Sequence, residues 1–260
     1  MPGVSLDHVK IFPSGEPFVT GAASLLISFI REKLQQQEIC TVVLAGGNTP
    51  RSIYQYFTEL PAEGQPDWKR IHFFWGDERT VPPTHPESNY RMVAESLLNH
   101  LSIPESNIHR MKGELPPAQA AEDYRKQLHQ FFQGRMPAFD LVILGLGADG
   151  HTASLFPGTT AVKEKEKWVT EVYVEQLNTW RITLTFPVIN HAQQIVFLVA
   201  GTAKAAILEK LMNLVEASPT LPASLVKPET GEVMWLLDEA AGRTGFPGDS
   251  GPSKKVILPF

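Results

Sequence analysis

The strongest candidates for chemistry in this sequence are an aspartate and a histidine two positions apart in a glycine-rich loop. Asp149 and His151 lie in the stretch LVILGLGADGHTASLFPG, directly after an apolar run. A histidine beside a carboxylate can accept and return protons near neutral pH. Parallel sheets also bind their ligands at the carboxyl ends of buried strands. The pair therefore predicts a site of acid–base chemistry at this loop.

The same stretch resembles a dinucleotide-binding fingerprint. Its glycines follow the G-x-G-x-x-G spacing at Gly145, Gly147 and Gly150. Glu171 stands where such proteins carry an acidic residue. However, the third glycine of that fingerprint opens a full helix whose amides face the pyrophosphate, whereas Pro157 and Gly158 stop a helix here. Asp149 would also repel a diphosphate, so dinucleotide binding is the weaker interpretation.

A second loop, LAGGNTPRSIY, could hold a phosphate group. Gly46 and Gly47 permit backbone conformations that expose N–H groups, Thr49 suits the N-cap of a helix and Pro50 suits its first position. A phosphate can bind at such a helix N-terminus. The loop lacks the lysine of an NTPase P-loop. A tight turn before a well-capped helix explains the same residues equally well.

Charged residues follow two further apolar runs. Asp77, Glu78 and Arg79 come directly after an aromatic run and a glycine, where an exposed ion pair is the plain alternative. In VFLVAGTAKAAILEKL, Thr202 is expected to cap a helix and Lys204 to fall in its first turn. A cation there opposes the helix dipole, and such local conflicts are typical of functional sites. Arg181, which opens the run RITLTF, is a further candidate cation.

The elements that must position these loops follow from an alternation of short apolar runs with longer helical patterns, which is typical of βαβ units. The apolar runs are Val9 to Phe12, Ile39 to Leu44, Ile71 to Trp75, Leu141 to Leu146, Trp168 to Val174, Ile195 to Ala200 and Val233 to Leu237. The helical patterns are Phe18 to Ile30, Pro50 to Leu60, Glu87 to Leu101, Pro117 to Phe132 and Thr202 to Val215. Several apolar runs lack polar alternation, as expected of parallel strands covered on both faces. The sequence predicts an α/β fold: a three-layer sandwich with a mostly parallel, Rossmann-like central sheet and helices on both faces.

Composition and charge narrow the classes of partner. A net charge of −5 offers no basic surface for nucleic acid or an anionic membrane. The single cysteine, Cys40, excludes a disulfide framework or a cysteine-based metal site within the chain. The apolar stretch from Phe18 to Ile30 has helical spacing and lacks the flanks of a signal peptide, and no run is long enough to span a membrane. We expect a cytoplasmic monomer whose partner is a small molecule.

We expect one α/β domain over residues 1–241 and a Gly- and Pro-rich tail over residues 242–260. The tail contains GDSGP at Gly248 to Pro252, which resembles the nucleophile loop of chymotrypsin-like proteases. Those enzymes are built from β-barrels, so a frayed terminus is the better interpretation. The alternating charges from Lys163 to Lys167 predict a solvated helix face.

Together these loops resemble the 6-phosphogluconolactonase family, within a larger family that also contains glucosamine-6-phosphate deaminase. The resemblance spans nearly the whole chain and rests on motifs in this order: GGNTP, GDER, HPESNY, DLVILGLGADGHTASLFPG, RITLTFPVIN and AGTAKAAIL. It implies hydrolysis of 6-phospho-D-glucono-1,5-lactone to 6-phosphogluconate in the pentose phosphate pathway, without a metal or another cofactor.

The resemblance also implies roles for the candidate residues. A lactone is an activated ester, so a general base and a stabiliser of the oxyanion suffice, and no G-x-S-x-G serine is needed. His151 would take a proton from water and return it to the departing ring oxygen. Arg79 would steady the negative charge, while Asp77 or Asp149 would orient the histidine or the sugar hydroxyls. The 6-phosphate would lie among Gly46, Gly47, Asn48, Thr49, Arg181 and Lys204.

The alternative enzyme is the deaminase. Members of that branch carry a tyrosine after their Asp-Glu pair and an acidic residue five positions after the histidine, where this sequence has Arg79 and Phe156. Moving protons between the carbons of an amino sugar needs more acid–base groups than one hydrolytic step, so these replacements disfavour deamination. A third, non-enzymatic alternative is a sugar-phosphate sensor, which would need no Asp-x-His arrangement.

Overall fold

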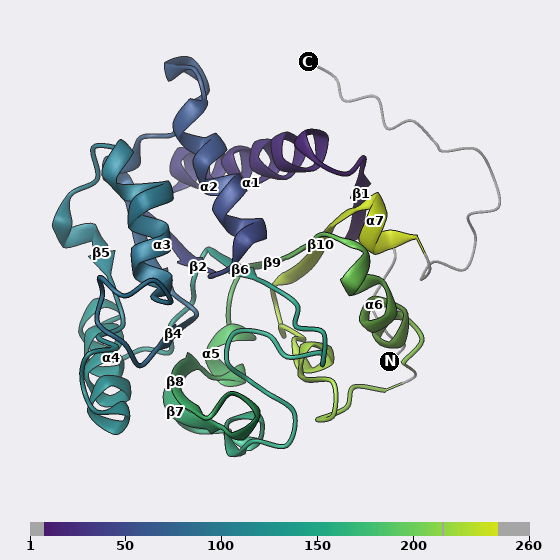
Figure 1. The fold of residues 1–260 in the computed structure, drawn as a ribbon. Helices are drawn as coiled ribbons and strands as arrows, with labels where there is room; N and C mark the ends of the chain where they lie inside the picture. The colour runs from purple at the N-terminus through teal and green to yellow at the C-terminus, as the bar shows by residue number, and fades with distance from the viewer. Residues whose placement is uncertain (1–7, 215, 244–260) are drawn as a thin grey trace.

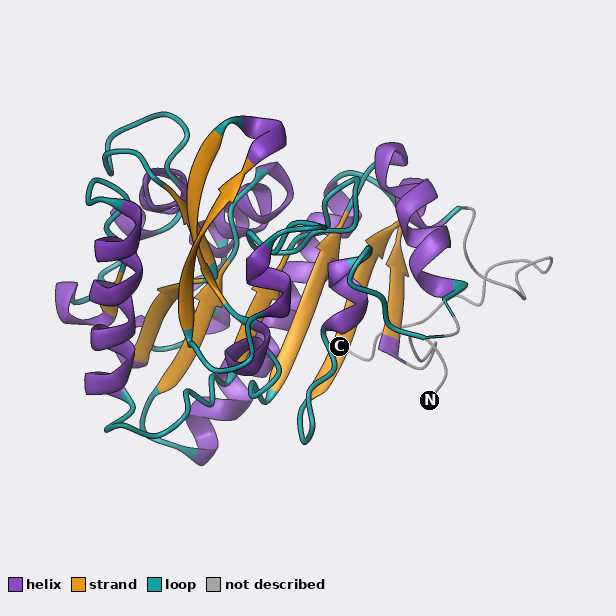
Figure 2. Cartoon of the chain, turned by 90° about the horizontal axis from the view of Figure 1, so that it is seen from below, coloured by secondary structure: helices purple, strands orange, loops and turns teal. Residues whose placement is uncertain are grey.

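A parallel sheet forms the centre of the computed structural model, which describes residues 8–214 and 216–243. Seven strands follow the order β1-β10-β9-β6-β2-β3-β5, and each neighbouring pair is parallel. Figure 2 shows these strands side by side, with their arrowheads toward the same edge. The predicted α/β fold with a mostly parallel central sheet is confirmed.

The strands of the central sheet are short and mostly buried. They are β1 (Val9–Phe12), β2 (Cys40–Leu44), β3 (Ile71–Trp75), β5 (Ile108–His109), β6 (Leu141–Leu144), β9 (Gln194–Val199) and β10 (Glu232–Asp238). β2, β6 and β9 are buried along their whole length, which explains why their sequences are apolar without alternation. Of these strands, β5 was not predicted, because two residues carry no readable pattern.

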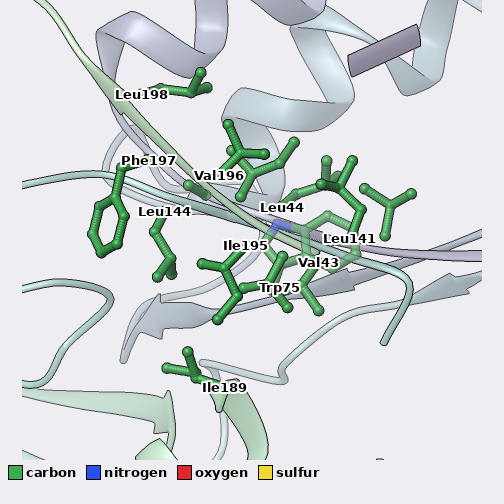
Figure 3. Close-up of a cluster of buried hydrophobic side chains, with 14 of the residues drawn as sticks. Val43, Leu44, Trp75, Leu141, Leu144, Ile189, Ile195, Val196, Phe197 and Leu198 are labelled. Atoms are coloured by element: carbon green, nitrogen blue, oxygen red, sulfur yellow. The ribbon is translucent and has the colours of Figure 1, made fainter. Parts of the chain in front are cut away.

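Helices cover both faces of the sheet. They are α1 (Glu16–Gln36), α2 (Asn48–Glu59), α3 (Asn89–Ser96), α4 (Pro117–Phe131), α5 (Phe186–Ile189), α6 (Ala205–Met212) and α7 (Glu239–Gly242). In Figure 1, α1 and α2 lie above the sheet, while α5 and the β7–β8 hairpin lie below it. Between these layers the side chains of neighbouring strands form the core, among them Val43, Trp75, Leu144 and Phe197 (Figure 3).

The order in which the chain adds strands to the sheet reverses between β2 and β6. From β2 the chain continues to β3 and β5 on one side, whereas from β6 it continues to β9 and β10 on the other. Where two such neighbouring strands lead away from each other, the loops at their carboxyl ends separate and leave a crevice. The glycine-rich loops after β2 and after β6 therefore meet at the point where an open α/β sheet binds its ligand.

A second, three-stranded antiparallel sheet was not predicted. It has the order β4-β8-β7, with β4 at Asp77–Arg79, β7 at Val169–Val174 and β8 at Thr179–Leu184. The apolar run Trp168 to Val174, expected as a parallel strand, instead pairs antiparallel with β8. A tight connection ending in Asn178, with a φ of 47°, allows the hairpin. In Figure 2 this hairpin crosses in front of the central strands.

One further local expectation is wrong, and another is confirmed only in part. The run Lys163 to Lys167 is not a helix face: a 3₁₀ turn ends at Lys163, and the Glu164 carboxylate accepts hydrogen bonds from the next three backbone amides. The predicted helix from Glu87 to Leu101 is shorter, because α3 begins at Asn89, is capped by the Ser88 side chain and gives way to a 3₁₀ turn. Of the predicted tail, Gly242 closes α7, and residues 244–260 lie outside the described residues.

Candidate active site

A cavity of about 570 Å³ opens at the carboxyl ends of the central strands. Its lining includes most of the predicted site residues: Gly46, Gly47, Asp77, Arg79, Asp149, His151, Arg181 and Lys204. They come from the loops after β2, β6 and β9, from the short strand β4 that follows β3, and from strand β8 of the covering hairpin. The fold thus brings into one cavity residues that are far apart in the sequence.

Asp149 holds the imidazole of His151. Its Oδ1 lies 2.5 Å from the ring Nδ1 and accepts a second hydrogen bond, 3.1 Å long, from the His151 amide. The loop is closed by a hydrogen bond from the Gly147 amide to the His151 carbonyl. A Cβ at Gly147 would lie 2.1 Å from the ring Nδ1, so only glycine permits this close approach. Of the two carboxylates considered for orienting the histidine, Asp149 is the one in contact with it.

Three cationic side chains reach the same cavity. Arg79 and Arg181 are direct partners across β4 and β8, and Lys204 ends the 3₁₀ turn that precedes α6. Within the described part of the chain, none of the three forms an ion pair with a carboxylate. Burial, followed by the neighbouring charge of Arg79, lowers the pKa of the Arg181 guanidinium. A buried Nη1 atom of Arg181 also lacks a hydrogen-bond partner among the described residues. This arrangement suits an anion that would offset the repulsion.

Asp77 and Glu78 are neighbours in sequence but have different surroundings. The Glu78 carboxylate is buried and accepts hydrogen bonds from the backbone amides of Asn89 and Tyr90, so it anchors the start of α3. Burial raises its pKa, against the lowering effect of these amides. Asp77 faces the cavity, and its Oδ2 accepts a hydrogen bond 2.6 Å long from Ser154 Oγ. The alternative interpretation, an exposed ion pair at this position, therefore does not hold among the described residues.

The glycine loop after β2 differs from its prediction in where the helix begins. Helix α2 starts at Asn48, and its N-cap is Gly47 with a φ of 106°, so Thr49 is not the N-cap and Pro50 is not the first residue. Within the described residues, the amides of Gly47, Asn48 and Thr49 donate no hydrogen bond. Gly46 is required by a close approach, since a Cβ there would lie 1.9 Å from Asn89 Oδ1. Gly46 and Gly47 line the cavity, whereas Asn48 and Thr49 are not among its lining residues.

The second predicted helix start is also displaced. Gly201, with a φ of 93°, is the N-cap of a 3₁₀ turn, so Thr202 is its first residue and does not cap it with a side chain. The Asp238 carboxylate at the end of β10 accepts a hydrogen bond from the backbone amide of Gly201. In both loops a glycine with positive φ replaces the expected hydroxyl cap, because only glycine readily adopts this conformation. In the loop after β2, this leaves the amide of Gly47, which lines the cavity, without a hydrogen-bond partner among the described residues.

Sequence reasoning missed contributions from Ser154, Asn89 and Phe156. Ser154 and Asn89 both hydrogen-bond Asp77, and the Ser154 contact joins residues 77 positions apart. Phe156 stacks on His151, with ring centroids 4.0 Å apart. All three stand inside motifs that were recognised, but spacing alone does not reveal which side chains meet after folding.

The chain matches the family described as "Glucosamine-6-phosphate isomerases/6-phosphogluconolactonase" over residues 13–235. A 6-phosphogluconolactonase from Synechocystis sp. is 45% identical over 207 residues, which are 78% of this chain and 83% of the relative. The chain belongs to this family. Among solved structures, the 6-phosphogluconolactonase of Thermotoga maritima superposes with a TM-score of 0.77 at 30% identity, covering 88% of this chain and 98% of that one.

The fold is shared by both branches of the family. A monomeric glucosamine-6-phosphate deaminase superposes with a TM-score of 0.75 at 21% identity, covering 90% of this chain and 98% of that one. The common architecture therefore does not separate a lactonase from a deaminase, and the side chains of the cavity must do so. Among the described residues, no group of three or more potential metal ligands is present, and no helix is long and apolar enough to cross a membrane.

Proposed function

We propose that this chain hydrolyses 6-phospho-D-glucono-1,5-lactone to 6-phosphogluconate, with His151 as the general base on the attacking water and residues 1–241 as the domain that carries the reaction. The observation that carries the proposal is a single cavity that combines the Asp149–His151 pair with cations lacking an acidic partner in the described chain. The relatives support lactone hydrolysis in the pentose phosphate pathway. The roles of individual residues rest on the geometry.

The contact with Asp149 determines which nitrogen of His151 can act as the base. An ionised carboxylate only accepts hydrogen bonds, so the Nδ1 atom facing Asp149 Oδ1 carries the proton. Nε2 then keeps its lone pair and can accept a proton from water. The carboxylate also stabilises the imidazolium that forms when water is deprotonated. This is the arrangement a general base needs at neutral pH.

One hydrolytic cycle follows from this tautomer. Nε2 of His151 accepts a proton from water as the water oxygen bonds to the lactone carbonyl carbon, which yields a tetrahedral oxyanion. The oxyanion collapses, the bond from that carbon to the ring oxygen breaks, and the imidazolium returns its proton to this oxygen. The product is an open-chain acid, and the histidine is neutral again. Arg79 lies in the same cavity and supplies positive charge where the oxyanion develops.

The remaining cations suit the phosphate of the substrate. Arg181 and Lys204 reach the cavity, as do the glycines that precede α2. Phosphates bind where helix N-termini present free amides beside positive side chains. Because Arg79 and Arg181 are cross-strand partners, one bound substrate can place its phosphate and its reacting carbonyl near adjacent guanidinium groups.

Deamination of glucosamine 6-phosphate is the second candidate, because the fold is common to both activities. The residue five positions after the histidine is Phe156, and its ring covers the imidazole. A phenyl ring carries no proton, so this position adds no acid–base group to the cavity. The arrangement favours the single proton transfer of hydrolysis over the several transfers of deamination.

The decisive experiment follows lactone opening by purified protein with a chelator present and with spontaneous hydrolysis subtracted. We expect enzymatic opening of the phosphorylated lactone that is undiminished by the chelator. A chelator-sensitive rate would contradict the expectation of metal-free chemistry. Release of ammonia from glucosamine 6-phosphate would instead support the deaminase. Binding of 6-phosphogluconate without turnover of either substrate would support a sugar-phosphate sensor.

A further inference from the structure

The ring of Phe156 covers one face of the imidazole of His151. Their centroids are 4.0 Å apart, and the ring planes are inclined by 28°. Phe156 is 7% exposed although it borders the cavity. Asp149 Oδ1 accepts a hydrogen bond from the ring at Nδ1, and the ring edge with Nδ1 and Cε1 occupies the space that a Cβ at Gly147 would fill. The imidazole is thus confined on a face and on one edge, while no described residue hydrogen-bonds Nε2.

The chain turns sharply between these two residues. Ala153 adopts a φ of 47°, a left-handed conformation that is unfavourable for a residue with a side chain. Thr152 and Leu155 form an isolated bridge, and the Leu155 amide donates to the Thr152 carbonyl. This reversal carries Phe156 back over His151. Strained backbone is retained where the surrounding structure requires it, and here it creates the stacking contact.

Phe156 also stands between two hollows of the surface. It lines the candidate active-site cavity and a neighbouring groove of about 830 Å³, which is bordered by strand β7. A smaller side chain would enlarge both hollows at the face of the histidine. The aromatic ring therefore has two physical effects at this position. It restricts the imidazole, and it forms part of the lining of both hollows.

We propose that Phe156 is a positioning residue, whose ring holds the imidazole of His151 in the plane set by Asp149 so that Nε2 points at the substrate. The inference rests on the proposed function, because it requires His151 to be the base. A single hydrogen bond at Nδ1 leaves the ring free to swing about that contact, and face contact with an aromatic ring removes this freedom. Displacing a catalytic group by about 1 Å can cost on the order of a hundredfold in rate.

The test compares two replacements of the same residue. Phe156→Leu keeps an apolar side chain of similar size but has no planar face, whereas Phe156→Tyr keeps the ring. We expect the leucine variant to lose roughly tenfold or more in kcat, with a KM within about twofold because the cations that bind the phosphate are untouched. The tyrosine variant should retain most of the wild-type kcat. If Phe156 merely fills space, leucine should perform at least as well as tyrosine.

A matched control lies elsewhere in the sheet. Phe74 stacks on His109 with a centroid distance of 4.4 Å, so Phe74→Leu removes an aromatic ring from a histidine outside the cavity. It should leave the kcat per folded molecule unchanged. NMR of the His151 ring protons verifies the contact itself, because the ring current of Phe156 acts on these protons in the wild type and the tyrosine variant but not in the leucine variant.

A double variant separates this inference from the function on which it rests. In a His151→Ala background, Phe156→Leu should produce no further loss of turnover, since its effect acts through the histidine. Wild-type kcat in folded Phe156→Leu, or an equal loss with and without His151, would overturn the positioning role. Full activity of His151→Ala itself would instead overturn the proposed mechanism.

Discussion

Two regions of the molecule place a histidine against a phenylalanine ring, with different outcomes. At the cavity, His151 stacks on Phe156 and bonds the carboxylate of Asp149. At the sheet edge, His109 stacks on Phe74, and its Nε2 lies 3.1 Å from Nδ1 of His72. The edge pair has no carboxylate among its hydrogen-bond partners in the described chain.

The surroundings of the edge pair disfavour the charged form of both imidazoles. Burial, followed by the charge of His72, lowers the pKa of His109 to about 4. Burial also lowers the pKa of His72. Burial opposes protonation there, as expected when a charge loses water and gains no counter-charge. The two histidines share aromatic stacking, and only His151 adds a carboxylate partner and a place at the cavity.

The most direct test of the difference between the two histidines is to replace each of them in turn. His151→Ala should lower lactone turnover by roughly a hundredfold or more, the usual contribution of a general base. His109→Phe, which preserves an aromatic ring on Phe74, should leave turnover unchanged. Steady-state kinetics on both purified variants, with circular dichroism to verify folding, checks the pair of expectations. Near-normal turnover without His151 would remove it from the mechanism.

The cations of the cavity offer the next largest effect. Lys204→Ala should weaken binding of 6-phosphogluconate by roughly 1.5 to 3 kcal/mol, the range for a hydrogen bond to a charged group. The apo protein should be equally or slightly more stable, because the lysine opposes the dipole at the start of α6. Calorimetric titration and thermal melts measure the two effects separately.

Lys210, in the last turn of α6, is the matched control for this prediction. Lys210→Ala should leave 6-phosphogluconate binding unchanged. Unphosphorylated gluconolactone should be indifferent to both changes, since it has no phosphate to meet the ammonium group. A Lys204 variant that is less stable yet binds 6-phosphogluconate normally would mark a structural lysine and refute this placement of the phosphate.

Changing the carboxylate should have a smaller effect than removing the base. Asp149→Asn retains the size of the side chain but loses the charge that stabilises the imidazolium and selects the Nδ1-protonated tautomer. We expect a fall in kcat of about tenfold or more with little change in KM. A normal kcat in this variant would show that the contact at 2.5 Å has no catalytic consequence.

The smallest expected effect concerns stability at the sheet edge. The folded pKa of His109 is lowered from 6.5 to about 4, so between these values the unfolded chain binds more protons. The contribution of His109 to the free energy of unfolding is therefore fully present above the pKa of the unfolded chain. It is lost as the pH falls toward the pKa of the folded protein. His109→Phe should reduce the loss of unfolding free energy between about pH 7.5 and pH 5 by about 1 kcal/mol, after allowance for solvent screening. Urea titrations at both pH values provide the measurement, and an unchanged pH dependence would contradict the assignment.

Much of the fold could be predicted from the sequence because its signals are local. Continuous apolar runs such as Cys40 to Leu44 can be buried on both faces only in a covered parallel sheet, and the alternation with helical patterns then implies βαβ connections. The glycines at Gly46, Gly47 and Gly147 signal unusual backbone conformations or close approaches, and the structure uses each of them in this way. The candidate residues after β2, β3, β6 and β9 were recognisable because parallel strands end at one edge.

What the sequence by itself determined is the set of loops that carry the chemistry and the sheet edge on which they lie. Only the tertiary structure decided which of these residues meet. Asp149 rather than Asp77 reaches His151, whereas Asp77 accepts a hydrogen bond from Ser154. Glu78, between two candidates, points the other way and anchors α3, since successive residues of a strand face opposite sides. Such contacts join positions far apart along the chain, and local pattern carries no information about distance in space until the sheet has assembled.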